Sequence, residues 1–156
     1  MKILIILIIG VPILILFYFS YLAYQSHQGT AQGLINNQLS PCPDSPNCIN
    51  SEFSDDSAHF TSALTFQDKT QDEISDIMQR VIKSTGGEVT NQKDNYISAI
   101  YITKIFKFVD DFEVRIDSEN NVIHFRSASR VGRSDLGANQ KRIDKIKQEI
   151  DLAIVK

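Results

Sequence analysis

The sequence predicts an α+β domain preceded by one transmembrane helix. Three observations lead to this prediction: an uncharged apolar run near the start, two later stretches with helical apolar spacing, and β-type stretches in succession between those two. Strands in succession with a helix near each end favour an antiparallel sheet of about five strands with both helices packed on one face. We expect the element order β-α-β-β-β-β-α.

Residues 3–24 form the apolar run and contain no charged side chain. A helix of this length spans about 33 Å, enough for the hydrocarbon core of a bilayer. The alternative is a cleaved signal peptide, but the run exceeds the usual apolar core of such peptides and no small-x-small cleavage site follows it cleanly. We therefore expect residues 1–24 to be a retained anchor whose partner is the lipid bilayer.

Basic residues set the expected orientation of this anchor. Lys2 precedes the span, and the next Lys or Arg is Lys69. This asymmetry places the N-terminus in the cytoplasm and the domain in the periplasm or at the cell exterior. Residues 25–40 are polar, lack a sustained apolar period and are expected to be a tether, so that the extracytoplasmic domain covers residues 41–156.

Composition excludes one class of partner and narrows the chemistry. A net charge of -3 argues against general nucleic-acid binding, which needs an excess of Lys and Arg. Cys42 and Cys48 are the only cysteines, and outside the cytoplasm such a pair predicts a disulfide. We expect no metal, because zinc would need two further ligands and the three histidines are scattered. We expect no cofactor either.

The first part of the domain predicts a strand followed by a capped helix. Residues 58–66 have short β-type character. Thr70 and Glu73 form a capping box, and Gly86 and Gly87 end the helix. Apolar residues recur between them at helical spacing, at Ile74, Ile77, Met78, Val81 and Ile82.

The next four strands are expected at residues 87–91, 96–104, 106–117 and 121–129. The last two form a hairpin in which Glu113 opposes Arg126, because shifting the turn to Asn120-Asn121 would instead oppose Arg115 and Arg126. The pairs on the other face are then Ile116 with Ile123, Val114 with Phe125, Phe112 with Ser127, and Asp110 with Ser129.

A final helix is expected over residues 139–154, with Asn139 as its N-cap. Its inward positions are Ile143, Ile146, Ile150 and Ala153. Lys141 and Arg142 lie in its first turn, where the macrodipole disfavours positive charge. Neighbouring aspartates or a bound anion should compensate.

The segment joining the last strand to this helix concentrates groups able to hold an anion, because five cations and two serines converge on a helix N-terminus. The alternative is a structural Arg–Asp network that holds the loop to the helix. The candidate ligand-binding residues are Arg126, Ser127, Ser129, Arg130, Arg133, Ser134, Asp135, Asn139, Lys141 and Arg142.

Asp110 and Asp111 are the candidate catalytic residues. Paired carboxylates serve glycosidases, but they must face a common gap, and neighbours on one strand point to opposite faces. The same alternation argues against a Ser-His-Asp triad within the hairpin, since Ser127 and Ser129 point toward the helices with Asp110 while His124 points away.

Several motifs stand out in the domain: Pro41-Cys-Pro-Asp-Ser-Pro-Asn-Cys48, Phe108-Val-Asp-Asp111, Arg126-Ser-Ala-Ser-Arg-Val-Gly132, Ser134-Asp-Leu-Gly137 and Asn139-x-Lys-Arg-Ile143. Together they resemble the domain-of-unknown-function family numbered 1499, over about residues 39–150. The resemblance implies no established activity, and it supports the position of the candidate site rather than its chemistry. Many members are similar in having an N-terminal membrane segment or export signal.

The first functional expectation is a membrane-anchored extracytoplasmic domain that recognises an anionic group, carried by a small molecule, a lipid head group or an envelope component. The second is a hydrolase or transferase on an anionic substrate, with Asp110 or Asp111 as base and the arginines stabilising developing charge. The third is a purely structural envelope protein in which the arginine motif holds the fold together.

Overall fold

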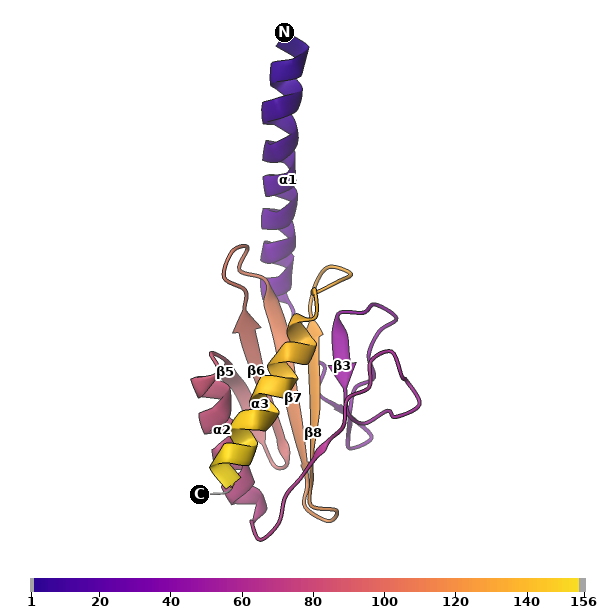
Figure 1. The fold of residues 1–156 in the computed structure, drawn as a ribbon, viewed down its shortest axis with the longest axis vertical. Helices are drawn as coiled ribbons and strands as arrows, with labels where there is room; N and C mark the ends of the chain where they lie inside the picture. The colour runs from indigo at the N-terminus through magenta and orange to yellow at the C-terminus, as the bar shows by residue number, and fades with distance from the viewer. Residues whose placement is uncertain (1, 155–156) are drawn as a thin grey trace.

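An antiparallel sheet forms the centre of the folded part of the computed structural model, which describes residues 2–154 (Figure 1). The expected ends at residues 1 and 156 lie outside the described residues. Strand order is β3-β8-β7-β6-β5, and β4 also pairs with β8. The α+β class is confirmed, with six strands in the sheet rather than about five. The strands are β3 (Cys48–Asn50), β4 (Leu64–Thr65), β5 (Glu88–Lys93), β6 (Tyr96–Ile102), β7 (Val109–Asp117) and β8 (Val122–Ser129).

Helices α2 (Gln71–Ser84) and α3 (Ala138–Ile154) cover one face of this sheet, as expected (Figure 1). The capping box of α2 is present, with Thr70 and Glu73 each accepting a hydrogen bond from the backbone N–H of the other. Gly86, at φ 95°, follows the helix and allows the chain to turn into β5. All but one of the predicted core positions of the two helices are buried: Ile74, Ile77, Met78, Val81 and Ile82 in α2, and Ile143, Ile146 and Ile150 in α3. The exception, Ala153 in α3, is half-buried and packs against the core.

The β7–β8 hairpin has the predicted register. Asp110 pairs with Ser129 and Glu113 with Arg126, and the intervening pairs agree. Apolar side chains of β7 and β8 therefore join the helix-covered core, where Phe112, Val114, Ile116, Ile123 and Phe125 lie together. The alternate residues, including Glu113 and Arg126, point to the opposite face.

That opposite face is covered by the segment expected to be a polar tether. Residues 29–40 fold against the sheet and contain a small hairpin of β1 (Leu34–Ile35) and β2 (Gln38–Leu39). Its two-residue turn, Asn36-Asn37, takes positive φ at both positions, as a tight hairpin requires. Leu39 is fully buried, and the Gly33 N–H donates to Glu113 Oε1 at 2.8 Å. The folded region thus begins well before residue 41.

Helix α1 (Lys2–Gln28) projects from one end of the sheet (Figure 1). Its segment Ile8–Gln28 is long and apolar enough to cross a membrane. The last turn contacts the domain, because Ser26 Oγ accepts a hydrogen bond from the Val109 N–H at 3.1 Å. His27 Nε2 also lies 2.9 Å from the Lys107 carbonyl oxygen. In the described part of the chain, α1 is therefore followed directly by a segment that packs on the domain.

Two local predictions were wrong. The strand expected over residues 58–66 is limited to β4, and most of the segment is loop. Asn139 does not cap α3, which begins at Ala138. Asp135 performs that role instead, because its Oδ2 accepts from the Asn139 N–H at 2.6 Å and its Oδ1 from the Gly137 N–H at 3.0 Å. An aspartate before the helix satisfies free N–H groups and complements the macrodipole.

Candidate functional site

The strand-to-helix segment does not gather its cations at one place. Strand alternation sends Ser127 and Ser129 toward α3 and Arg126 and Arg130 toward the opposite face. Three of the five cations, Arg126, Arg130 and Arg142, form ion pairs with carboxylates of β7. The ten predicted binding residues therefore fall into three groups: one facing α3, one on the opposite face of the sheet, and one outside both.

The group facing α3 is a closed hydrogen-bond network. Arg142 Nη2 donates to Asp110 Oδ2 at 2.7 Å, and its Nη1 donates to Ser127 Oγ at 2.7 Å and to Asn139 Oδ1. Asn139 Nδ2 donates to the Asn47 carbonyl at 2.8 Å. The Arg142 guanidinium also lies over the Tyr101 ring, 4.6 Å from its centroid. This network holds α3 on the sheet and supports the structural interpretation for these residues.

On the opposite face, Arg130 forms a bidentate pair with Asp111. Its Nε and Nη2 donate to the two carboxylate oxygens at 2.9 and 2.7 Å. The remaining nitrogen, Nη1, donates to the carbonyl of Ser26 at 3.0 Å. Arg130 therefore joins the end of α1 to β7, and its charge is neutralised locally.

Arg126 lies deeper on the same face, beside Glu113. Its Nη1 donates to Glu113 Oε2 at 2.7 Å, and the two residues are 2% and 0% exposed. Glu113 Oε1 also accepts from the Tyr96 hydroxyl at 2.7 Å. Burial, reinforced by the Glu113 charge, raises the pKa of Tyr96, so its hydroxyl stays protonated as a donor. Each carboxylate oxygen of Glu113 therefore has a donor, Oε1 from Tyr96 and Oε2 from Arg126 Nη1.

The guanidinium of Arg126, in contrast, is not fully used. Its Nε is buried and has no hydrogen-bond partner among residues 2–154. Buried N–H groups normally have an acceptor, and leaving one without costs about 1–3 kcal/mol. An arginine that keeps a buried donor free is a candidate contact for a ligand oxygen.

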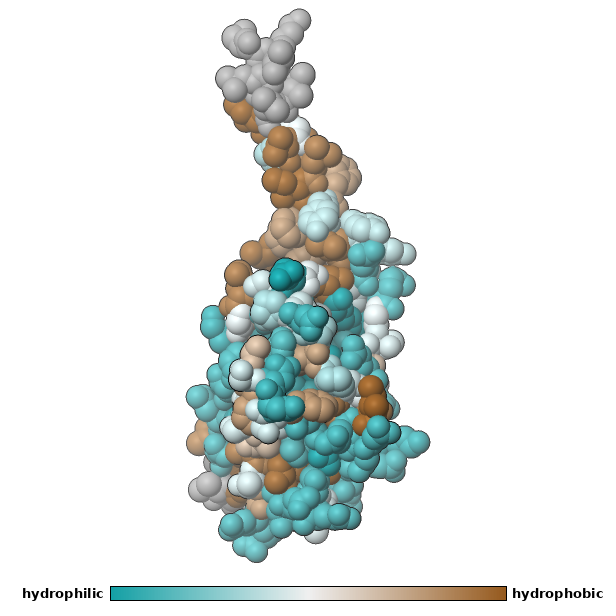
Figure 2. Space-filling view, turned by 90° about the vertical axis from the view of Figure 1, so that its right-hand side faces the viewer, coloured by the Kyte–Doolittle hydropathy of each residue, from teal (hydrophilic) through white to brown (hydrophobic). Residues whose placement is uncertain are grey.

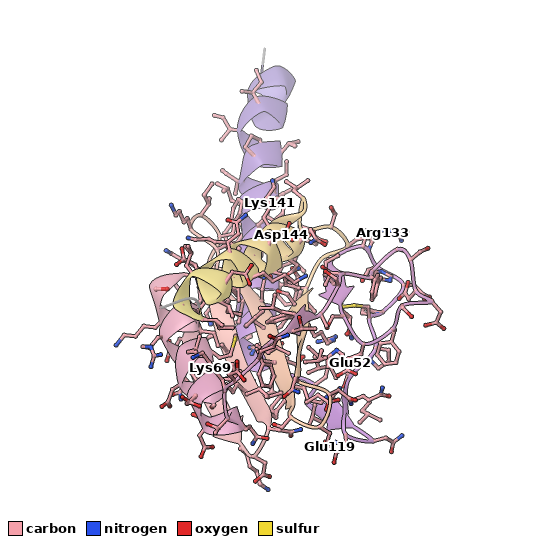
Figure 3. The ribbon with its side chains drawn as sticks, turned by 60° about the horizontal axis from the view of Figure 1, so that its bottom comes forward. Glu52, Lys69, Glu119, Arg133, Lys141 and Asp144 are labelled. Carbon is pink, nitrogen blue, oxygen red and sulfur yellow. A yellow bond between two sulfur atoms is a disulfide. The ribbon has the colours of Figure 1, made fainter. Side chains whose placement is uncertain are left out.

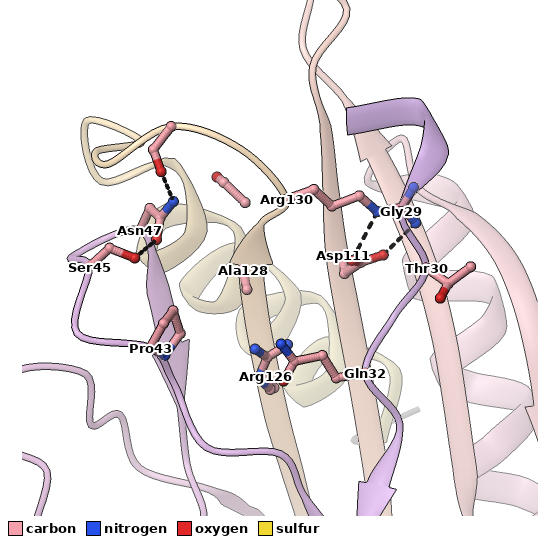
Figure 4. A pocket seen from close by; sticks show the side chains of 12 residues that line it. Gly29, Thr30, Gln32, Pro43, Ser45, Asn47, Asp111, Arg126, Ala128 and Arg130 are labelled. Atoms are coloured by element: carbon pink, nitrogen blue, oxygen red, sulfur yellow. Dashed lines mark hydrogen bonds and ion pairs between the residues drawn. The ribbon is translucent and has the colours of Figure 1, made fainter. Parts of the chain in front are cut away.

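Arg126 lines a pocket of about 300 Å³ on this face (Figure 4). One wall is the chain leaving α1, a second is the disulfide loop, and the floor is formed by the ends of β7 and β8. Arg130 and Asp111 meet on the α1 side of the pocket, while Arg126 lies lower, between Pro43 and Gln32 in this view. The lining residues are Gly29, Thr30, Gln32, Pro43, Ser45, Asn47, Asp111, Arg126, Ala128, Ser129, Arg130 and Gly132.

The predicted disulfide between Cys42 and Cys48 is confirmed and closes the loop that forms the second wall. Within this loop, Ser45 Oγ donates to Asn47 Oδ1 at 2.7 Å, and Asn47 Nδ2 donates to the Gly132 carbonyl at 2.8 Å. Sequence reasoning treated this motif only as a covalent link. Its two small polar residues were the available sign that it also borders a site.

The remaining predicted residues lie outside the pocket. Arg133 and Lys141 are exposed and form no ion pair within residues 2–154 (Figure 3). Ser134 accepts a hydrogen bond from the Leu136 N–H at 3.4 Å. Asp135 caps α3, as described above. None of these four contributes to the pocket that contains Arg126.

The two candidate catalytic residues do not share a gap. Asp110 pairs with Arg142 on the α3 side, and Asp111 pairs with Arg130 on the other side. Both carboxylates are buried, and an arginine holds each of them in an ion pair. Within residues 2–154, moreover, no group of three or more His, Cys, Asp or Glu side chains forms a metal site.

Comparison with protein families gives a match over most of the folded region. Residues 38–150 match the family described as "Protein of unknown function (DUF1499)". The matched region starts at β2 and covers the sheet, the disulfide loop, α2 and most of α3. No curated protein matches the chain.

Proposed function

The chain belongs to the DUF1499 family, and we propose that it is a membrane-anchored extracytoplasmic domain that binds a small anionic molecule in the pocket beside Arg126. The carrying observation is the buried Arg126 Nε without an acceptor. A carboxylate or phosphate oxygen that entered the pocket and reached this N–H would accept from it and remove the cost of leaving it unpaired.

The charges around the pocket restrict the ligand. Arg126 pairs with Glu113 and Arg130 pairs with Asp111, so the net charge of these four side chains is zero. Such a site favours a ligand with one anionic group over a polyphosphate, which needs several unpaired cations. Neutral polar side chains, including Thr30, Gln32 and Ser45, complete the lining and suit hydroxyl or amide groups elsewhere on the ligand.

Four features support the anchored, extracytoplasmic location. Helix α1 is long and apolar enough to span a bilayer. The charge asymmetry around it, with Lys2 before the span and no further Lys or Arg until Lys69, favours a cytoplasmic N-terminus. The Cys42–Cys48 disulfide is typical of oxidising compartments. The contacts of Ser26 with Val109 and Arg130 also favour a retained helix, with the folded domain starting at about residue 29.

Binding is tested by thermal unfolding of the full chain in detergent, in the presence of a panel of monocarboxylates and inorganic phosphate. A ligand at a hundred times its dissociation constant adds about 2.7 kcal/mol to the free energy of unfolding. The decisive variant is Ala128→Leu, because Ala128 lines the pocket but makes no side-chain hydrogen bond. The larger side chain fills the pocket and leaves the Arg126–Glu113 pair in place.

Arg133→Gln is the matched control, since Arg133 is an exposed arginine of the same segment outside the pocket. We expect the stabilisation to persist in Arg133→Gln and to disappear in Ala128→Leu. If a probe stabilised both the unsubstituted chain and Ala128→Leu but did not stabilise Arg133→Gln, the ligand would bind the exposed loop instead. That outcome would reject the pocket.

A further inference from the structure

Two loops lie at the end of the domain from which α1 projects. Residues 103–108 connect β6 to β7, and residues 130–137 connect β8 to α3. The first loop contacts α1 directly, because the Phe19 and Phe106 rings stack with centroids 4.7 Å apart. The loop is also closed on itself, since the Thr103 N–H donates to the Phe108 carbonyl at 2.9 Å and the Phe108 N–H to Thr103 Oγ1 at 2.9 Å.

The tips of both loops expose large aliphatic side chains. Ile105 is 82% exposed and Leu136 is 88% exposed. Leu136 also takes a positive φ of 55°, which is uncommon for residues other than glycine. Single exposed apolar residues are ordinary, but two on adjoining loops at one end of a domain, next to an apolar helix, indicate an interaction surface.

The space between the loops and α1 is an apolar pocket of about 330 Å³. Phe19 and Leu22 of α1 form one side, and Phe106, Val131 and Leu136 are among the loop residues that form the other. In Figure 2 the brown apolar surface of α1 continues onto the adjoining end of the domain. The apolar surface of the candidate span and that of the loops are therefore one surface.

Depth follows from the Phe19–Phe106 contact. Phe19 lies within the candidate span Ile8–Gln28. About 20 helical residues are needed to cross the hydrocarbon core. If α1 enters the core on the cytoplasmic side near residue 3, it reaches the outer edge of the core near Phe19 and Leu22. Phe106 stacks on Phe19 and must share its depth, which carries the 103–108 loop into the bilayer interface.

The charges on the loops agree with such a location. Lys104 and Lys107 flank Ile105 and Phe106, and Arg133 precedes Leu136; all three cations are exposed. Alternating basic and apolar or aromatic side chains are typical of segments that lie in the interface of anionic membranes, where the cations contact head groups and the apolar chains enter the acyl region. These are the cations that the pocket beside Arg126 does not use.

We propose that residues 103–108 and 130–137 form a membrane-docking surface that inserts Ile105 and Leu136 into the outer interface of the bilayer spanned by α1. The proposal rests on α1 being a retained span, as proposed above. The occupant is the lipid bilayer rather than a second protein, because the docking surface is continuous with α1 and carries cations around an apolar centre. It is independent of the ligand pocket on the sheet.

The chain contains no tryptophan, so single-tryptophan variants report depth without background. Ile105→Trp and Leu136→Trp test the loops in the full chain, reconstituted in vesicles of phosphatidylglycerol and phosphatidylcholine with brominated acyl chains. Phe17→Trp, at a 70% exposed position of α1, reports insertion of the helix itself. Ile35→Trp is the matched control, since Ile35 is 54% exposed on β1, away from α1.

We expect brominated lipid to remove most of the emission of Phe17→Trp, Ile105→Trp and Leu136→Trp, and little of that of Ile35→Trp. Emission from the two loop variants should also shift to shorter wavelength. In the Ile105→Trp background, Lys104→Glu with Lys107→Glu should reduce quenching in vesicles that contain phosphatidylglycerol, and much less in phosphatidylcholine alone.

The outcomes separate the two proposals. Quenching of Phe17→Trp alone would overturn the docking surface while leaving the anchor, and it would assign the exposed loops to a protein partner or a second copy of the chain. Absence of quenching in Phe17→Trp would overturn both. Equal quenching of Ile105→Trp and Ile35→Trp would also reject docking, because it would reflect general access of lipid to the domain.

Discussion

Removing Arg126 should destabilise the fold strongly, and removing its partner at the same time should restore much of the loss. Arg126→Met keeps most of the aliphatic volume but leaves Glu113, which is 0% exposed, without its counter-ion. Breaking a buried ion pair on one side costs about 3–5 kcal/mol, because an uncompensated charge remains buried. Glu113 would keep only the donors of Gly33 and Tyr96.

The double variant Glu113→Gln with Arg126→Met contains no buried charge at this place. The amide oxygen of the introduced glutamine can still accept from the Gly33 N–H and the Tyr96 hydroxyl, and the main cost is an amide N–H₂ without an acceptor, about 1–3 kcal/mol. The double variant should therefore be more stable than Arg126→Met alone, by about 2 kcal/mol on these magnitudes. A double-mutant cycle that includes Glu113→Gln alone then measures the coupling energy of the pair.

Urea unfolding of the full chain in detergent, followed by tyrosine fluorescence, gives these free energies, provided that the slope with denaturant is unchanged. Arg133→Met is the control, because Arg133 is exposed and surface substitutions usually change stability by less than about 0.5 kcal/mol. An Arg126→Met variant as stable as Arg133→Met would show that Glu113 does not need this counter-ion. So would a double variant less stable than Arg126→Met, since the charge left behind would then not be the cause.

Two further predictions concern other parts of the fold. Gly87→Ala should lower the free energy of unfolding by about 1–3 kcal/mol, because the added Cβ would lie 2.6 Å from Tyr101 Cζ and 2.8 Å from Ile82 Cγ2; an unchanged thermal midpoint would contradict this packing. Burial lowers the pKa of His124, so between that pKa and about 6.5 the unfolded chain binds more protons and stability should fall as pH falls. An NMR titration that placed this pKa at or above 6.5 would contradict the prediction, and His124→Gln should remove that part of the pH dependence.

The elements that could be predicted are those whose evidence is local in the sequence. Thr70 and Glu73, which form the capping box, are three residues apart in the sequence. The β7–β8 register follows from the alternation of side chains on two strands joined by a short turn. A turn at Asn120-Asn121 would have paired Arg115 with Arg126, two like charges. The charges of the paired side chains therefore selected the register. The prediction that Asp110 and Asp111 point to opposite faces followed from the same alternation and argued against a catalytic pair.

The parts that could not be predicted depend on contacts between distant residues. Gly33 and Glu113 are 80 residues apart, and Asn47 and Asn139 are 92 apart. A polar segment such as residues 29–40 shows no apolar period, because most of its contact with the sheet is through hydrogen bonds and one buried leucine, Leu39. Its polarity therefore resembled that of a tether.

The burial of Arg126 was hidden for the same reason. Five cations in one segment suggest an exposed cluster. Arg126 is buried because residues 29–40 fold over its side of the sheet, whereas Arg133 remains exposed. The opposite-charge pair with Glu113 was predicted, but its depth was not. The one buried side-chain donor that lacks a partner within residues 2–154 could be found only from the three-dimensional arrangement of the segments around it.

The direct junction of α1 with the domain limits how the molecule can move. A domain on a flexible linker tumbles and presents every side to its surroundings. Here Gln28 is followed at once by Gly29, which packs on Arg130, and Ser26 is hydrogen-bonded to both Val109 and Arg130. If α1 crosses the bilayer as proposed, the domain rotates about the helix axis and diffuses laterally with α1, and it tilts only together with α1. Its pocket then keeps a fixed orientation relative to α1, and its distance from the lipid changes only as α1 tilts.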